Sequence, residues 1–192
     1  MRLQLLALFA LLAGCAGQTE LPPVRLILVG DSTLAPNNGY GDALCARLKP
    51  QVACLNVAKN GRSSGSFRAE GLWDAKVLAP LADKSVYKTS YVLIEFGHND
   101  QPGKPGRSTD LKTEFPINIA RYVDEVRAAG GTPLLATPLT RRSFDGKEGR
   151  LQNDLQPWAD ATKRIAAEKQ VPLIDLLAAS GAAVQAMGQA EA

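Results

Sequence analysis

Short apolar runs alternate along the chain with segments in which apolar residues recur at helical spacing. Short runs that end near Gly, Pro or Asn are typical of buried strands, whereas recurrence every three to four residues is typical of helices. The apolar runs predict five strands, at residues 24–30, 52–58, 91–96, 132–137 and 171–176. The helical spacing predicts helices over residues 40–48, 66–81, 116–129 and 153–169, with a further helical segment after Leu177.

Two of the predicted helices carry local signals. Ser66 stands at the start of the second helix, where its hydroxyl would cap the first turn, and Pro80 stands near the end. In the third helix four apolar residues share one face, which we expect to be buried: Ile117, Ala120, Val123 and Val126.

The alternation of strands and helices indicates the fold class. Strands that are continuous apolar runs are typical of a parallel sheet covered on both faces, because both sides of each strand are then buried. We therefore predict a three-layer α/β/α sandwich of the flavodoxin-like type, with five parallel strands in the order 2-1-3-4-5. In such sheets ligands bind beyond the carboxyl ends of the strands, so the loops after the first three strands are the place to look for chemistry.

The N-terminus differs in composition from the rest of the chain. Residues 1–14 hold one early arginine, a short run dominated by Leu and Ala, and then small residues, which is the pattern of a signal peptide. The run is too short to span a bilayer as a mature helix. A buried core helix is the alternative interpretation.

The end of that segment, Leu-Ala-Gly-Cys at residues 12–15, resembles the bacterial lipobox. In a lipobox the cysteine thiol is acylated and becomes the first residue of the mature protein. By this resemblance Cys15 carries acyl chains that hold the protein at a membrane surface, and residues 15–23 form a tether. The resemblance implies export to the bacterial cell envelope, either in the periplasm or at the cell surface, and residues 24–192 are the expected folded domain.

Composition and charge exclude several other classes of protein. The chain has 192 residues, of which 45% are hydrophobic and 21% charged, as in ordinary globular domains. The net charge is +3, and the basic residues are scattered among acidic ones, so nothing favours a nucleic-acid partner. There is no cluster of His, Cys and acidic residues with the spacing of a metal site, and no cofactor is implied.

Two cysteines remain in the expected mature domain. Cys45 should lie on the first helix, and Cys54 near the start of the second strand. An oxidising compartment permits a disulfide between them. The alternative is a pair of buried free thiols.

Three strand-end loops carry groups that suit ester chemistry. Ser32, in Gly-Asp-Ser-Thr after the first strand, would present its hydroxyl at the sheet rim, although a serine there can simply cap a helix. Gly61, in Asn-Gly-Arg-Ser-Ser after the second strand, can point an unobstructed N–H at an oxyanion, or can be a plain turn residue. Asn99, in Gly-His-Asn-Asp after the third strand, can offer its amide to the same oxyanion, or can belong to a polar turn.

The three loops occur in this order at successive strand ends, and together they resemble the GDSL/SGNH hydrolases. The resembling stretches are GDSTLAP, YGDAL, NVAKNGRSSGSF with EGLW, FGHND and TPLTRRSFD, and they extend over residues 24–188. The resemblance is strongest to the rhamnogalacturonan acetylesterase branch. It implies that Ser32 is the nucleophile. It also implies that the backbone N–H groups of Ser32 and Gly61 and the side-chain amide of Asn99 form the oxyanion hole.

The base that a catalytic serine needs is not evident. The family takes a His and an Asp from a D-x-x-H loop near the C-terminus, and no such segment follows Leu177. His98 is the one histidine of the sequence, and it lies beside Asn99, which must face the oxyanion, so we do not expect it to act as the base. We expect a C-terminally truncated domain from a longer gene product; a naturally shortened protein is the alternative.

The sequence thus predicts a carbohydrate esterase that removes O-acetyl groups from a pectin-type polysaccharide, is monomeric, and has little activity as written. A non-catalytic carbohydrate-binding remnant is the alternative from another class. A lipase or thioesterase of the same superfamily is the third hypothesis, and it would need a broad apolar acyl groove that a sequence does not reveal.

Overall fold

The computed structural model describes residues 24–83, 85–146 and 149–191. Its strands are β1 Val24–Gly30, β2 Val52–Asn56, β3 Thr89–Glu95, β4 Thr132–Ala136 and β5 Leu173–Ile174. Its helices are α1 Gly41–Cys45, α2 Ser66–Ala69, α3 Ala79–Ala82, α4 Glu114–Ala128, α5 Gln156–Glu168 and α6 Leu176–Met187, and a π-helical segment, η1, covers Asp74–Leu78. The expected signal peptide and tether, with Cys15, lie outside the described residues.

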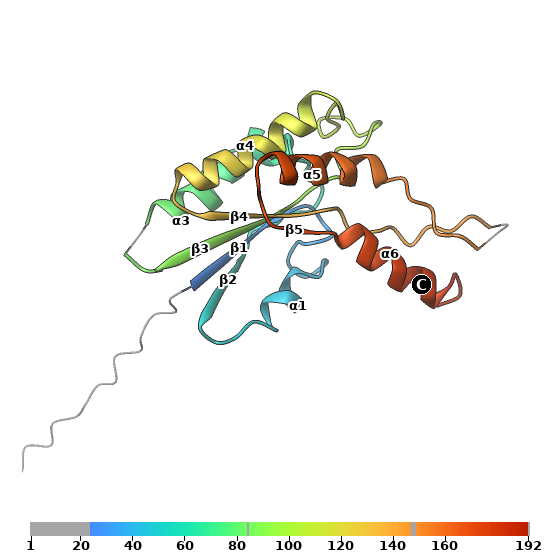
Figure 1. Cartoon of the computed structure of the whole chain (residues 1–192), viewed down its shortest axis with the longest axis horizontal. Helices are drawn as coiled ribbons and strands as arrows, with labels where there is room; N and C mark the ends of the chain where they lie inside the picture. The colour runs from blue at the N-terminus through green and yellow to red at the C-terminus, as the bar shows by residue number, and fades with distance from the viewer. Residues whose placement is uncertain (1–23, 84, 147–148, 192) are drawn as a thin grey trace, which may run out of the picture.

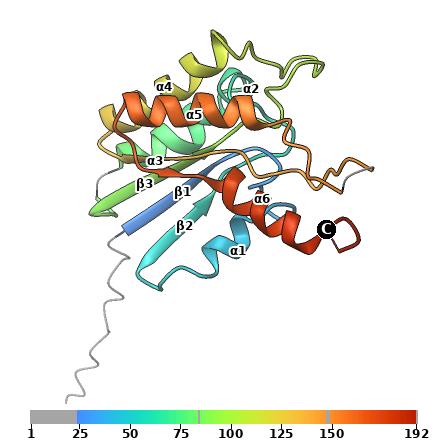
Figure 2. The same ribbon diagram turned by 45° about the vertical axis from the view of Figure 1, so that its right-hand side comes forward.

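The five strands form one parallel sheet in the order β2-β1-β3-β4-β5, as the sequence predicted. Helices α3, α4 and α5 cover one face, and α1 and α6 lie on the other (Figures 1 and 2). The predicted three-layer α/β/α sandwich is therefore confirmed. All strands run in the same direction, so the loops that follow β1, β2 and β3 meet at one edge of the sheet.

The core divides into two layers because successive side chains of a strand point to opposite faces. On β1, Ile27 and Val29 are fully buried in the layer that also contains Tyr122 of α4. Leu28, between them, is buried on the other face together with Leu34 of the following loop. A central strand that is buried on both faces holds the residues just beyond its end, among them Ser32, in a fixed position.

The prediction of one continuous helix over residues 66–81 is wrong. Gly71 has a φ of +72°, a conformation that favours glycine, and it separates α2 from η1, which runs directly into α3. Gly65, not Ser66, precedes the first turn, whereas Pro80 lies two residues before the last residue of α3, Ala82, near a helix end as predicted. The broken segment still buries an apolar face, formed by Trp73, Val77 and Leu81.

The predicted buried face of α4 is wrong in one residue, because Ile117 is 64% exposed. The buried side chains of this helix are instead Phe115, Ile119, Tyr122, Val123 and Val126. Consecutive helical residues differ by about 100°, so Ile117 points roughly 200° away from both Phe115 and Ile119. Its exposure leaves an apolar side chain at the surface near the start of α4.

The remaining departures concern element length and the cysteines. The first helix covers only Gly41–Cys45, and β5 has two residues, both partly exposed at the edge of the sheet. A disulfide joins Cys45, the last residue of α1, to Cys54 of β2, with 5.4 Å between the Cα atoms. Within the part of the chain that the structure describes, no helix is both long and apolar enough to cross a membrane.

Candidate active site

Ser32 lies at the tip of a tight turn directly after β1. The carboxylate of Asp31 accepts hydrogen bonds from the backbone N–H of Thr33 at 2.9 Å and from its hydroxyl at 2.8 Å. This local bonding turns the chain as soon as the strand ends. Asp31 is fully buried and Ser32 half-buried, so the serine is presented at the edge of the sheet while its neighbour anchors the turn.

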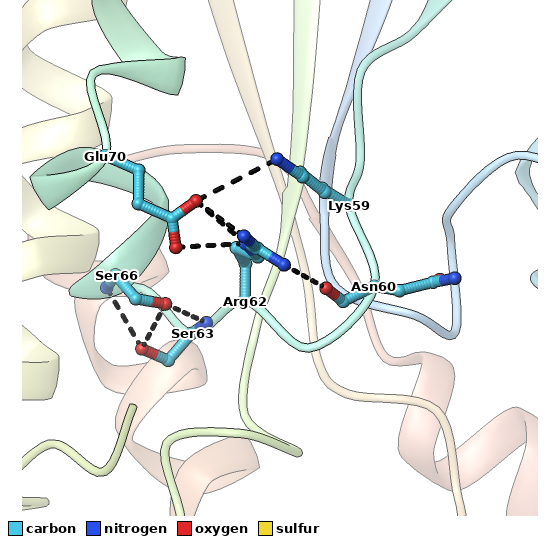
Figure 3. A network of polar contacts seen from close by, with 6 residues as sticks. All are labelled: Lys59, Asn60, Arg62, Ser63, Ser66 and Glu70. Atoms are coloured by element: carbon cyan, nitrogen blue, oxygen red, sulfur yellow. Dashed lines mark hydrogen bonds and ion pairs between the residues drawn. The ribbon is translucent and has the colours of Figure 1, made fainter. Parts of the chain in front are cut away.

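The loop after β2 lies beside that turn, because the N–H of Lys59 donates to the carbonyl of Gly30 at 3.0 Å. Gly61 has a φ of +76°, so its backbone conformation suits glycine. The guanidinium of Arg62 reaches one way to Glu70, at 2.7 Å, and the other way to the carbonyl oxygen of Asn60, at 2.9 Å (Figure 3). These contacts hold the residues on both sides of Gly61.

The loop after β3 is bonded to the loop after β2. The side-chain amide of Asn99 donates to the carbonyl of Arg62 at 3.0 Å, and Asn99 is only 6% exposed. One residue further, buried Asp100 accepts from the N–H of Ser64 at 3.1 Å and from its hydroxyl at 2.5 Å. Burial raises the pKa of Asp100 to about 6, although these hydrogen bonds work in the opposite direction.

The structure therefore places the three predicted site residues on adjacent loops of one sheet edge. Gly61 and Asn99 are linked through Arg62, and Ser32 follows a strand whose last residue, Gly30, is paired with Glu95 at the end of β3. Among the described residues no hydrogen bond joins the Ser32 hydroxyl to another side chain. The geometry supports a shared site but leaves the catalytic roles of these residues as predictions.

His98 is held by a contact that fixes the tautomer of its ring. Its Nε2 lies 2.7 Å from the carbonyl oxygen of Leu139. A carbonyl accepts hydrogen bonds only, so Nε2 must carry the proton and donate. Burial lowers the pKa of His98, and the ring is therefore neutral at neutral pH. Nε2 is therefore not the atom that could take a proton from Ser32, and among the described residues no hydrogen bond joins the Ser32 hydroxyl to the other ring nitrogen, Nδ1.

The structure also contains a buried carboxylate pair that we did not predict. Glu95, the last residue of β3, is fully buried; one carboxylate oxygen contacts the Thr33 hydroxyl and the Leu139 N–H, both at 3.0 Å, and the other contacts the Tyr40 hydroxyl, also at 3.0 Å. Thr33 also reaches Asp31, so a single hydroxyl lies between two carboxylates. Its one hydrogen can satisfy only one of them at a time, and a proton on Glu95 resolves the conflict.

Burial governs the titration of Glu95. Burial and, to a lesser extent, the nearby charge of Asp31 together raise the pKa of Glu95 to about 7. A charged residue inside the apolar run of residues 91–96 was the signal in the sequence that could have revealed this buried carboxyl group.

Among residues 24–83, 85–146 and 149–191, no group of three or more His, Cys, Asp and Glu side chains is placed to hold a metal ion.

Comparison with known proteins agrees with this geometry. Residues 27–190 match the GDSL-like Lipase/Acylhydrolase family. The chain is 35% identical to rhamnogalacturonan acetylesterase RhgT of Bacillus subtilis, over 88% of this chain and 72% of that protein. It is 33% identical to the probable rhamnogalacturonan acetylesterase YesY of the same organism, over 80% of this chain and 70% of the relative.

Solved structures support the fold. The acetylxylan esterase Axe2 of Geobacillus stearothermophilus superposes with a TM-score of 0.64 at 19% identity, over 86% of this chain and 82% of its own. A Bacillus subtilis protein, YXIM, superposes with a TM-score of 0.71 at 24% identity over 86% of this chain, which spans only 47% of YXIM. The fold, the family match and the curated relatives together place the chain in the GDSL/SGNH hydrolase family, among the esterases that resemble rhamnogalacturonan acetylesterases.

Proposed function

We propose that the site removes acetyl groups from an acetylated polysaccharide, with Ser32 as the nucleophile. The proposal is based on the position of three loops at one edge of the sheet. Two of these loops are joined by the hydrogen bond from the Asn99 amide to the carbonyl of Arg62, the residue after Gly61. Two curated relatives that bear the name rhamnogalacturonan acetylesterase supply the substrate class. No metal or organic cofactor is part of this proposal.

The reaction is an acyl transfer in two steps. The Ser32 oxygen attacks the acetyl carbonyl and loses its proton to a base, and the sugar hydroxyl leaves with a proton. Water then attacks the acetyl-serine, and acetate leaves. In both steps the carbonyl oxygen becomes an oxyanion, which the N–H groups of Ser32 and Gly61 and the amide of Asn99 would stabilise, each worth on the order of 10²–10³ in rate.

The lack of an evident base for Ser32 limits the rate of ester hydrolysis that we expect from the chain alone. His98 is the single histidine of the sequence, its Nε2 donates to the Leu139 carbonyl, and among the described residues no hydrogen bond joins its ring to the Ser32 hydroxyl. We infer that hydrolysis by the chain as written is slow, since an unassisted serine hydroxyl is a weak nucleophile. The same observation favours a second function, a carbohydrate-binding protein that keeps the pocket without turnover.

The cellular location is part of the proposal. The lipobox-like residues 12–15 support acylation of Cys15 and attachment to a membrane of the bacterial envelope. A substrate as large as a polysaccharide is met outside the cytoplasm, which agrees with export.

An external base can test the catalytic assignment. Imidazole added with p-nitrophenyl acetate should support hydrolysis by the protein beyond the rate of imidazole alone, and Ser32→Ala should remove that excess. Mass spectrometry of the digested protein should find the acetyl group on the peptide that contains Ser32. An excess rate that persists in Ser32→Ala, with no acetyl on this peptide, would assign the chemistry to another group.

A further inference from the structure

A groove begins next to the candidate oxyanion hole. It is lined by residues of the loop after β2, including Gly65, by the segment from Gly106 to Thr109, and by Ile117 and Asn118 of α4. Its volume is about 410 Å³. Ligand clefts span roughly 300–1,000 Å³, so this groove has room for a sugar unit.

Arg107 stands where the groove meets the site. One terminal nitrogen of its guanidinium lies 3.5 Å from the Asn99 side-chain oxygen. The same nitrogen would be 3.5 Å from a side-chain carbon placed on Gly61. Arg107 therefore lies against both residues that are assigned to bind the oxyanion, and a group bound to its guanidinium would be held close to the reacting ester.

The neighbouring cations are already engaged. Arg62 is paired with Glu70 at 2.7 Å and Arg141 with Asp154 at 3.1 Å, while the Lys104 ammonium donates to the carbonyl of His98. Among the described residues no carboxylate forms an ion pair with Arg107, and its side chain is half-exposed. Arg107 is thus a guanidinium beside the candidate oxyanion hole that is available to an external anion.

We propose that this groove binds a uronic acid unit of the substrate and that Arg107 recognises its carboxylate, which makes Arg107 a specificity-determining residue. The planar guanidinium matches a carboxylate with two parallel hydrogen bonds. The exposed side chain of Ile117 gives an apolar surface for the C–H face of a sugar ring. This inference rests on the proposed function, because it names the class of polysaccharide that the esterase site would take.

Glu114, which also lines the groove, does not cancel the effect of Arg107. One of its carboxylate oxygens accepts a hydrogen bond from the backbone N–H of Asp110 at 2.7 Å, so this oxygen already has a partner within the protein. Ser66 and Thr109, also in the lining, are neutral. The groove therefore presents one available cation, from Arg107, and one carboxylate that is hydrogen-bonded to the chain, beside uncharged hydroxyl and amide groups.

Binding, rather than turnover, tests this proposal, since the readout must not depend on a base. Calorimetric titrations would compare an oligogalacturonate of defined length with its carboxyl-reduced, neutral counterpart. The wild-type protein should bind the acidic oligomer more tightly. Arg107→Gln should weaken that binding about tenfold and leave the neutral oligomer unaffected, because a hydrogen-bonded charge pair is lost. Arg107→Lys should retain part of the preference.

Arg47→Gln is the matched control, because this arginine is exposed beside α1 and bonds only to the Ala43 carbonyl among the described residues. It removes the same charge and should leave both affinities at the wild-type values. Equal binding of the two oligomers by the wild type, no binding of the acidic one, or an unchanged preference in Arg107→Gln would overturn the inference. The imidazole-supported assay on p-nitrophenyl acetate, a substrate without a carboxylate, tests the proposed chemistry separately.

Discussion

The amide of Asn99 donates to the carbonyl of Arg62 across 3.0 Å and thereby ties the loop after β3 to the loop after β2. An amide NH₂ group has two hydrogens. With one hydrogen held by Arg62, the direction of the other is fixed before any substrate binds. A donor that is oriented in advance stabilises an oxyanion without a cost of reorganisation at the moment of reaction.

Removal of this donor should reduce the rate much more than the stability. We expect Asn99→Ala to lower the imidazole-supported, Ser32-dependent rate by on the order of 10². The hydrogen bond to Arg62 is worth about 1 kcal/mol of folding free energy, so the protein should remain folded. The rate of p-nitrophenyl acetate hydrolysis tests the expected loss of activity, and unfolding in urea tests whether the protein remains folded. A rate that equals wild type would remove Asn99 from the oxyanion hole.

His98 should have a structural role. Without added imidazole, we expect hydrolysis of p-nitrophenyl acetate to be barely above background in the wild type and in His98→Ala alike. The variant should be less stable by about 1 kcal/mol, because the part-buried Leu139 carbonyl loses its partner. Robust wild-type activity that disappears in His98→Ala would show that the base was assigned wrongly. A parallel measurement on Ser32→Ala gives the background.

The buried carboxyl group of Glu95 should make stability depend on pH. The pKa of Glu95 is raised to about 7 in the folded protein, compared with 4.5 when the group is free, so the folded state keeps this proton to a higher pH than the unfolded state. The resulting stabilisation is present at pH 4.5 and is lost as the pH rises through about 7.

Glu95→Gln mimics the protonated side chain and should flatten this dependence between about pH 5 and pH 7.5, as measured by urea unfolding at a series of pH values. Asp100, with a pKa of about 6, keeps a smaller slope in the lower part of the range. Glu168→Gln, at an exposed position in α5, is the control and should behave as wild type. Identical slopes in all three proteins would show that Glu95 is ionised throughout.

Attachment to a membrane is tested on the full-length gene. We expect the wild-type protein in the membrane fraction of a bacterial host and Cys15→Ala in the soluble fraction, because the acyl chains on Cys15 would supply the membrane affinity. Metabolic labelling with a fatty acid should mark the wild type alone. Equal membrane association of the two proteins would contradict lipidation.

The strands could be predicted because each is a continuous apolar run, and their order follows the rules for parallel sheets. The helix over residues 66–81 could not, since the apolar spacing continues across Gly71 while the backbone turns away there. Ile117 was misassigned because the periodic pattern alone does not say where the face of α4 is centred. Sequence motifs placed Ser32, Gly61 and Asn99 on the correct loops.

A sequence motif does not show which group a side chain will hydrogen-bond to. His98 and Leu139 are 41 residues apart, and Asn99 and Arg62 are 37 apart. Those contacts form only when the strands assemble into the sheet. The hydrogen bonds of the His98 ring and of the Asn99 amide could therefore be found only from the structure. Arg107 likewise looked like an ordinary loop residue until its guanidinium was found against Gly61.

The disulfide between Cys45 and Cys54 has a consequence for the outer strand of the sheet. Strand β2 is one of the two edge strands and pairs with β1 alone, so it is held to the sheet on one side only. The bridge ties this strand to α1, and detachment of β2 would have to carry the helix with it. Because β2 leads directly into the loop of Gly61 and Arg62, reduction of the bridge would loosen the oxyanion loop from a distance. The redox state of the compartment would then set how well the site is ordered.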